Sequence, residues 1–372
     1  MSIQEQMPRT YVSPGMPPLT LGKRFSFFEF WPTWLMYIPV VCQWLALALK
    51  YRSLTLPLIA NPKLPLSGMV GVPKSQLLSQ AKGELQKQVL PWFTVTRTED
   101  TLETQIVKLE QNLKAHHVHY PFVGKPDIGC RGAGVKLIKN RKELVQCLNK
   151  YPVGAAMMIQ RLSDYEPEAG IFYVRHPDQQ QGEIISMALK YMPYVIGDGQ
   201  HTLAELVARD DRAGELRHLY QNRHRAHWHE IVPAGKPYRL IFSASHSKGA
   251  IFKNASHLIT PELTRQLDAL MHDIPNFHYG RLDVKFKNVD QLTAGTDLQI
   301  VEINTASSEP LHIWDSNTPF RAAVRSLLFQ YRTLFELGHA NRQQGYRPPG
   351  LKALIAHWRL EQNLTQFYPE TD

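Results

Sequence analysis

Apolar and polar residues alternate in short blocks along most of the chain, and this pattern predicts strands and helices in turn. Seven apolar runs have the length and composition typical of strands: 120–126, 135–138, 154–162, 169–176, 183–196, 279–288 and 298–304. The last two are separated by a short polar stretch, so we expect them to pair as antiparallel strands. The mixture of strands and helices indicates an α+β fold.

Helical spacing separates these strands. Apolar residues recur every three or four positions in 98–115, and residues 140–150, 197–209, 257–274 and 320–364 also have helical character. At the start of the 197–209 segment, Thr202 and Glu205 have the spacing of a capping box.

The N-terminal region differs from the rest. Residues 1–22 are rich in proline and predict a flexible or extended arm. Residues 30–49 carry no charge, and this uncharged segment is just long enough to cross a bilayer. Pro32 and Pro39 would break a single straight helix. Three interpretations remain open for this segment within the region 23–97: a helix buried in the core, an interfacial segment on a membrane, or a span.

Composition limits the class of protein. The chain has 372 residues and a formal net charge of +9, which favours a polyanionic partner such as nucleotide phosphates or an anionic membrane face. No block of basic residues resembles a nucleic-acid arm, so we expect no nucleic-acid partner. The three cysteines are far apart and no secretory signal is recognisable, which fits a cytoplasmic protein without disulfides or structural zinc.

Two oxygen-bearing side chains lie one residue apart in "LQIVEIN". On a strand, Glu302 and Asn304 project to the same face. Asp283 lies on the neighbouring strand candidate, with Arg281 on the same face of that strand. Carboxylate and amide oxygens suit a hard cation such as Mg²⁺, and an arginine beside them suits a phosphate.

A glycine-rich loop follows the strand that carries Lys125. Gly129, Gly132 and Gly134 allow backbone N–H groups to approach an anion closely. A β-like run, not a helix, comes after the loop, so the segment differs from a P-loop and a dinucleotide-binding turn. We interpret it as a hairpin flap that can fold over phosphates.

The order of these motifs resembles the ATP-grasp superfamily of carboxylate–amine ligases. The resemblance covers residues 120–310 and rests on the glycine hairpin, "RLDV" and "VEIN". Stretches such as "YVIGDGQHTLAELV" are similar to the cyanophycin synthetase and glutathione-synthetase-like branches, and "VEINTASSEP" is similar to D-alanine–D-alanine ligase. The resemblance implies an ATP-grasp domain at 98–319, with two α/β lobes clasping ATP. A helical segment at 320–372 follows this domain, and an atypical N-terminal region precedes it.

The resemblance also implies roles for individual residues. It assigns ATP phosphates to Lys125 and Lys190 and the lid to Gly129, Arg131, Gly132 and Gly134, with Arg175 as a weaker phosphate candidate. It assigns adenine binding to a hinge made of Gln160, Arg161 and Leu162. It assigns the ribose hydroxyls to Glu168, with Glu166 as the alternative. Two Mg²⁺ ions, replaceable by Mn²⁺, are assigned to Asp283, Glu302 and Asn304. Arg281, together with Lys190, is the catalytic candidate that stabilises the acyl phosphate and the tetrahedral species.

The implied reaction activates a carboxylate as an acyl phosphate and joins it to an amine, releasing ADP and phosphate. The alternatives are an ATP-grasp phosphotransferase and a degenerate, membrane-tethered ATP-binding module. The identity of the acid and the amine, whether small or lipid-linked, is open, as is the oligomeric state. His246 and Lys248 stand where the related branch has an Asn- and Gly-rich loop, so the substrates are expected to differ. A peripheral position at the inner face of the membrane stays open as an alternative to a purely cytoplasmic one.

Overall fold

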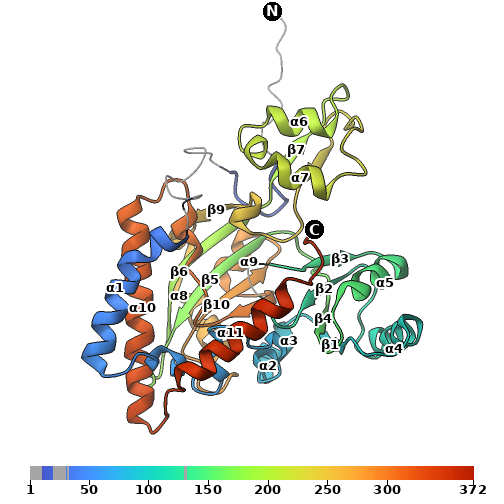
Figure 1. Ribbon diagram of the computed structural model, residues 1–372. Helices are drawn as coiled ribbons and strands as arrows, with labels where there is room; N and C mark the ends of the chain where they lie inside the picture. Colours follow the sequence, from blue (N-terminus) through green and yellow to red (C-terminus); the bar gives the residue numbers. More distant parts are fainter. Residues whose placement is uncertain (1–10, 20–30, 32, 130–131) are drawn as a thin grey trace, which may run out of the picture.

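The computed structural model describes residues 11–19, 31, 33–129 and 132–372. Two antiparallel sheets of four and five strands form the cores of two lobes (Figure 1). Helices cover both sheets, so the α+β class expected from the sequence is what the structure shows.

The smaller lobe contains the four-stranded sheet, in the order β1-β4-β2-β3. Two helices cover it, and their apolar sides pack with Phe93, Phe122 and Ile159 into one cluster. Strand β1 precedes residue 98, the expected start of this domain, and pairs with β4 along its whole length. The bounds are β1 Trp92–Thr96, β2 Phe122–Pro126, β3 Lys136–Ile138, β4 Ala156–Arg161, α4 Leu102–Ala115 and α5 Arg141–Lys150.

The larger lobe contains the five-stranded sheet, in the order β11-β10-β5-β6-β9. The expected pairing of the "RLDV" and "VEIN" strands is confirmed, since β10 and β11 are antiparallel neighbours. Helix α8 covers one face of the sheet with its apolar side, through Leu263 and Leu267. The bounds are β5 Glu168–Val174, β6 Glu183–Tyr191, β9 Ile251–Asn254, β10 Tyr279–Lys285, β11 Gln299–Asn304, α8 Pro261–Met271 and α9 Val289–Ala294.

The two faces of the five-stranded sheet have different environments because side chains alternate along each strand. Ile171 and Tyr173 on β5 belong to the core under α8. Phe172 and Val174 project to the other face and pack in the cluster that includes Leu334 of the C-terminal helices. Towards the start of β5 this second face becomes charged, beginning with Glu168.

A small unit lies on top of the larger lobe in Figure 1. It consists of the two-stranded sheet β7 (Tyr194–Ile196) and β8 (Pro237–Arg239) with helices α6 (Leu203–Arg209) and α7 (Arg217–Arg223). The capping box expected at the start of α6 is present, with the Thr202 hydroxyl accepting from the Glu205 N–H and the Glu205 carboxylate accepting from Thr202.

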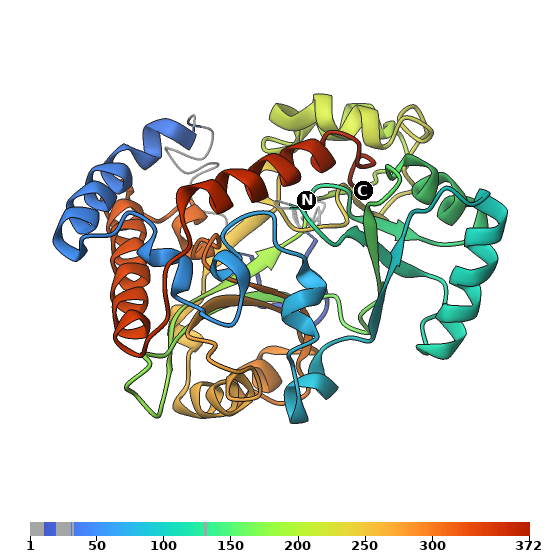
Figure 2. The same ribbon diagram turned by 60° about the horizontal axis from the view of Figure 1, so that its bottom comes forward.

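Three long helices border the larger lobe: α1 (Thr33–Tyr51), α10 (Phe320–Gln343) and α11 (Leu351–Thr365). Helices α1 and α10 lie side by side, and α11 crosses from the end of α10 towards the glycine loop (Figures 1 and 2). Residues 11–19 and the short helices α2 (Lys74–Leu78) and α3 (Gly83–Gln88) complete the larger lobe, where Val12 and Met16 pack against its core.

The apolar segment expected at 30–49 is largely this α1 helix. It continues through Pro39, so the expectation of a break there is wrong; ring contacts of Trp44 and Tyr51 with Phe335 hold the C-terminal half against α10. Only 11% of the apolar window 34–51 is buried, which rules out the interpretation as a core helix. Pro32 lies outside the described residues.

Candidate active site

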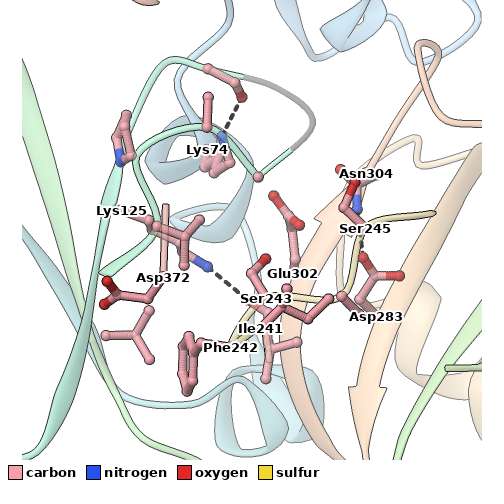
Figure 3. A pocket seen from close by; sticks show the side chains of 18 of the residues that line it. Lys74, Lys125, Ile241, Phe242, Ser243, Ser245, Asp283, Glu302, Asn304 and Asp372 are labelled. Carbon is pink, nitrogen blue, oxygen red and sulfur yellow. Dashed lines mark hydrogen bonds between the residues drawn. The ribbon is translucent and has the colours of Figure 1, made fainter. Parts of the chain in front are cut away.

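A cleft with a volume of about 1930 Å³ lies between the two sheets. Strands β2 and β4 contribute one wall, and β5, β6, β10 and β11 contribute the other. Figure 3 shows Lys125 reaching in from the smaller lobe, opposite Asp283 and Asn304, with Glu302 between them.

The register of β10 and β11 brings the expected acidic residues together. Asp283 lies directly opposite Glu302, and Arg281 lies directly opposite Asn304. Opposed residues in an antiparallel pair share a face, so all four side chains project into the cleft. The Asn304 amide donates to an Asp283 carboxylate oxygen at 3.2 Å, and Arg281 Nε donates to the other oxygen at 2.9 Å.

Ion pairs extend this group across the sheet. Lys190 Nζ lies 2.7 Å from a Glu168 oxygen and 2.9 Å from an Asp283 oxygen. Lys285 Nζ contacts the second oxygen of Glu168 at 2.9 Å. Each of these two carboxylates is therefore held by two cationic side chains, because Arg281 is the second partner of Asp283.

The pKa shifts follow from this pairing. Burial by itself raises the pKa of Glu168, but the charges of Lys190 and Lys285 outweigh burial and hold it far below its usual range. Burial works against the charge on Lys190 too, yet Asp283 and Glu168 raise its pKa above the ordinary value. These shifts favour the charged forms of Glu168, Asp283 and Lys190, whereas burial lowers the pKa of Lys285.

Gly170 leaves room for this cluster. It pairs with Asp283 on β10 and Ala188 on β6, in the middle of the charged face. A Cβ atom at this position would lie 2.7 Å from Leu311 Cδ1 and 3.3 Å from Asp283 Oδ1. A side chain here would displace the carboxylate from its partners.

Glu302 differs from the other acids. Within the described part of the chain, no hydrogen bond or ion pair involves its carboxylate, although Lys125 and Arg281 lie near enough to interact with its charge. It lines the cleft and is only partly buried. An accessible carboxylate beside Asp283 is suited to bind a cation from solution.

Lys125 is a buried lysine that has no acidic partner in hydrogen-bonding range among the described residues. Its Nζ donates to Gln160 Oε1 at 2.9 Å and to the Val301 carbonyl at 3.0 Å, which crosses from one lobe to the other. Burial lowers its pKa, an effect that Glu302 partly opposes and Lys74 reinforces. The amide nitrogen of Gln160 is buried and has no partner among the described residues.

The glycine loop lies over this lysine. Gly134 has φ +72°, and a Cβ there would lie 2.7 Å from Pro126 Cγ, so the close approach requires glycine. Lys74 Nζ donates to the Gly129 carbonyl at 2.5 Å, as Figure 3 shows. Arg131, expected to belong to the lid, lies outside the described residues.

Residues 371–372 contact the loop and β3, and the Phe242 N–H donates to the Asp372 carbonyl at 3.2 Å from the larger lobe. The Thr371 hydroxyl donates to the Gly132 carbonyl at 2.6 Å and accepts from the Gly134 N–H at 3.1 Å. The Asp372 carboxylate pairs with Lys136 and accepts from the Leu137 N–H. On the other side, Lys248 donates to the Gly132 carbonyl at 3.1 Å, and burial lowers its pKa to about 8.

The remaining expected residues divide into two groups. Arg161, Leu162, Glu166 and Glu168 all line the cleft, and Glu166 is exposed whereas Glu168 is held by two lysines. Arg175 is not placed in the cleft. It follows the far end of β5 and donates to the Phe277 carbonyl, so the expectation of a phosphate contact for Arg175 is wrong. Strand alternation also directs it away from the face that carries Glu168.

Sequence reasoning missed several residues that line the cleft. Tyr37 of α1 donates its hydroxyl to Glu309, and burial together with this carboxylate raises the Tyr37 pKa. Arg281 donates to the Glu309 carbonyl at 2.9 Å. Tyr37 and Glu309 are 272 positions apart, so no local pattern could have joined them. Lys285, by contrast, follows Asp283 by two residues and could have been found from strand alternation.

The donor set of the acidic group fits a hard divalent cation. Two carboxylates and an amide oxygen project from paired, rigid strands, and the Glu302 carboxylate has no hydrogen bond or ion pair among the described residues. Within the described ranges, no group of three His, Cys, Asp or Glu side chains could hold a metal, so the oxygen set here consists of two carboxylates and the Asn304 amide. That composition suits Mg²⁺, which commonly shares its coordination with substrate phosphates.

Comparison with known proteins gives structural matches only. No protein-family model matches the chain, and no curated protein sequence matches it. Similar solved structures include a bifunctional glutathione synthetase from Pasteurella multocida, with 17% identity and a TM-score of 0.34 over 69% of this chain and 35% of that one. This chain therefore spans about a third of that protein.

Two further structures are similar over more balanced lengths. D-alanine–D-alanine ligase from Bacillus anthracis has 13% identity and a TM-score of 0.39 over 74% of both chains. N5-carboxyaminoimidazole synthetase from Staphylococcus aureus, complexed with ADP, has 11% identity and a TM-score of 0.33 over 65% of this chain and 47% of that one.

All three similarities are low in both identity and TM-score, so they carry no argument about the function of this chain.

Proposed function

We propose that this protein is an ATP- and Mg²⁺-dependent ligase that activates a carboxylate as an acyl phosphate and joins it to an amine. The observation that carries the proposal is the meeting of Lys125 with the opposed pair Asp283 and Glu302 in one cleft beneath a glycine loop. Cations on one side and oxygen ligands on the other match a polyphosphate that carries a divalent metal.

The nucleotide would lie between the two sheets. Lys125 offers a charged donor whose present acceptors, an amide oxygen and a carbonyl, are neutral, so an incoming phosphate is the stronger partner. Gln160 has a buried amide nitrogen available for the base, beside Arg161 and Leu162. Glu166 is the accessible carboxylate for the ribose hydroxyls, and Glu168 is an alternative only if a lysine releases it.

Asp283, Glu302 and Asn304 would hold Mg²⁺ against the phosphates. The bound metal would polarise the phosphoryl oxygens and neutralise the charge that develops on them. Lys190, held between Glu168 and Asp283, would place a fixed positive charge beside the transferring group. The glycine loop would exclude water from the reactive intermediate.

The substrates supply every bond that forms and every leaving group in the two covalent steps. A carboxylate oxygen attacks the γ-phosphorus, the bond to the ADP oxygen breaks, and an acyl phosphate forms. The amine nitrogen then attacks the acyl carbon, phosphate leaves with the bonding electrons, and the amine loses a proton. Arg281 lies on the same strand face as Asp283, where it can stabilise the tetrahedral species.

Glu309 and Tyr37 are candidates for binding the amine. The Glu309 carboxylate lines the cleft, and its backbone carbonyl contacts Arg281, so the side chain lies near the expected acyl phosphate. A carboxylate at this position would attract an ammonium group and orient it before it loses its proton.

ADP and phosphate release with Mg²⁺-ATP tests the proposal. The purified chain is incubated with a panel of carboxylic acids, each with and without a panel of amines. We expect release that requires both an acid and an amine, with a product in which the two are joined, detected by mass spectrometry. The Glu302→Ala variant, checked for an unchanged melting temperature, should release phosphate on the order of 1000-fold more slowly.

The other outcomes separate the rival functions. Release with an acid alone, yielding a stable phosphorylated product, would replace the ligase with a phosphotransferase. Tight Mg²⁺-ATP binding with no release across the whole panel would replace it with a binding module. Equal release by Glu302→Ala and by a matched exposed variant, Glu183→Ala, would contradict the metal site.

A further inference from the structure

Helix α1 presents a continuous apolar stripe to solvent. Five large side chains follow one another at helical spacing along its outer side: Trp34, Ile38, Val41, Leu45 and Leu49. Their exposed fractions run from 47% at Ile38 to 82% at Leu49. Single exposed apolar residues are ordinary, but an unbroken row of this length marks an interaction surface.

The opposite side of the same helix is already occupied. Met36 and Val40 are buried against Ile313, Ala323 and Leu327, and Trp44 packs on Phe335 of α10. A helix held along one side by its own protein does not cross a bilayer by itself. It can lie flat on one, with the outer stripe inserted among the lipids.

The stripe has few polar groups for a protein partner. The exposed positions next to its five residues are Leu35, Cys42 and Ala46, so in the described part of the helix the indole N–H of Trp34 is the one strong hydrogen-bond donor on the outward surface before Lys50. Protein interfaces of useful size normally carry a hydrogen bond for every 100–200 Å² or so. An almost purely apolar strip with a tryptophan near one end is matched better by acyl chains and headgroups than by a second folded protein.

Charge around the stripe favours an anionic lipid surface. Helix α1 contains no acidic residue, and Lys50 and Arg52 are exposed where it ends. The adjoining helix α10 exposes Arg321 and Arg325, and the chain as a whole carries a net charge of +9. Trp34 near one end and Lys50 and Arg52 at the other are the residue types that anchor a segment in the headgroup region.

We propose that the outer stripe of α1 docks the protein on the surface of an anionic bilayer. The proposal does not depend on the ligase reaction. It has a consequence for that reaction, because Met36 and Tyr37 of the same helix line the cleft. Docking would therefore place one end of the cleft beside the headgroups, within reach of an amphiphilic substrate.

Vesicle co-sedimentation of the full chain tests the docking surface. The vesicles contain phosphatidylcholine alone, or phosphatidylcholine and phosphatidylglycerol in equal parts. We expect the chain to sediment with the mixed vesicles, and less so at high salt, because surface charge attraction is screened. The double variant Val41→Glu/Leu45→Glu should reduce the bound fraction at least about tenfold, because it puts two charges into the inserted stripe.

A matched double variant controls for surface charge. Val107→Glu/Val153→Glu changes two side chains that are 43% and 59% exposed, close to the 54% of both Val41 and Leu45, but away from α1. It should bind the vesicles like the unaltered chain. If the Val41/Leu45 variant does not fold, Leu49→Glu at the most exposed position replaces it.

Three results would overturn the proposal. The unaltered chain could stay in the supernatant with mixed vesicles, or both double variants could bind equally well. The stripe could also prove to be a dimer interface, in which case the chain would be dimeric by light scattering without lipid, and the Val41/Leu45 variant would be monomeric.

Discussion

Two buried lysines on opposite walls of the cleft have pKa values shifted in opposite directions. Lys190, on the five-stranded sheet, contacts the carboxylates of Glu168 and Asp283. Among the described residues, Lys125, on the four-stranded sheet, donates to an amide oxygen and a backbone carbonyl and pairs with no carboxylate. The pKa of Lys190 is raised and that of Lys125 is lowered, although burial opposes the charge of both.

The difference shows that neighbouring charges, rather than burial, decide whether the pKa of a buried lysine is raised or lowered here. On the wall that carries Lys190, Glu168 and Asp283 are each held by two cations and form a preformed ionic network, whereas Glu302 on the same wall has no ion pair among the described residues. The wall that carries Lys125 is short of negative charge and would gain most from a phosphate. We expect substitutions on the two walls to separate stability from ligand binding.

The largest effect is expected from Glu302→Ala, on turnover. Glu302 has no hydrogen bond or ion pair within the described ranges, so its removal should leave the melting temperature nearly unchanged. Loss of one metal-binding carboxylate should lower kcat on the order of 1000-fold. The variant is compared by phosphate release and calorimetry with Glu183→Ala, an exposed acid on β6. Unaltered turnover would remove Glu302 from the site.

Lys190→Met should have the largest effect on stability. It leaves Glu168 and Asp283 each with one cation where there were two, in a buried setting. We expect the free energy of unfolding to fall by about 3 kcal/mol, the lower end for a broken buried pair because Lys285 and Arg281 remain. Urea denaturation measures the loss.

Lys125→Met should give the reverse pattern. Burial disfavours the charged form of Lys125, so an apolar side chain of similar length should leave the free energy of unfolding unchanged or slightly higher. ATP affinity should fall roughly 10- to 100-fold, because a charge-assisted contact to phosphate is lost. Isothermal titration with Mg²⁺-ATP and urea denaturation are run on both lysine variants. If Lys125→Met lowered the free energy of unfolding as much as Lys190→Met does, the proposed difference between the two walls would be contradicted.

The smallest effect concerns Lys248 and pH. Its pKa of about 8 lies below the ordinary 10.5 of a lysine, so the side chain is charged below pH 8 and neutral above it. Its burial therefore costs stability below pH 8, and this cost disappears as the pH rises from 8 to 10.5. Because Lys248 contacts the glycine loop, we expect the KM for ATP to rise roughly threefold between pH 7 and 9 as its charge is lost.

The Lys248→Met variant isolates this effect. Its KM for ATP should change less between pH 7 and 9 than that of the unaltered chain, whereas Lys87→Met, at an exposed position, should behave like the unaltered chain. Identical pH profiles for Lys248→Met and the unaltered chain would exclude a role for Lys248 in the lid.

Strand periodicity explains why much of the site could be predicted. Two residues separate Arg281 from Asp283 on β10, and the same spacing separates Glu302 from Asn304 on β11. The alternation of side chains along a strand therefore fixes a common face for each pair. The glycine loop could be recognised because a left-handed backbone in close contact with its neighbours, as at Gly134, strongly favours glycine. Arg175 was assigned wrongly because motif order did not show that it lies beyond the far end of β5, on the opposite face.

By itself, the sequence determined the features that depend on neighbours within a few residues: the α+β class, the strand pair that carries the acids, the glycine loop and the apolar character of α1. Only the tertiary structure decided what these segments meet. It brought Tyr37 to Glu309, Lys74 to Gly129, and Thr371 to Gly132, and it left one side of α1 uncovered. Contacts between distant segments depend on how whole elements pack, and no local spacing encodes that packing.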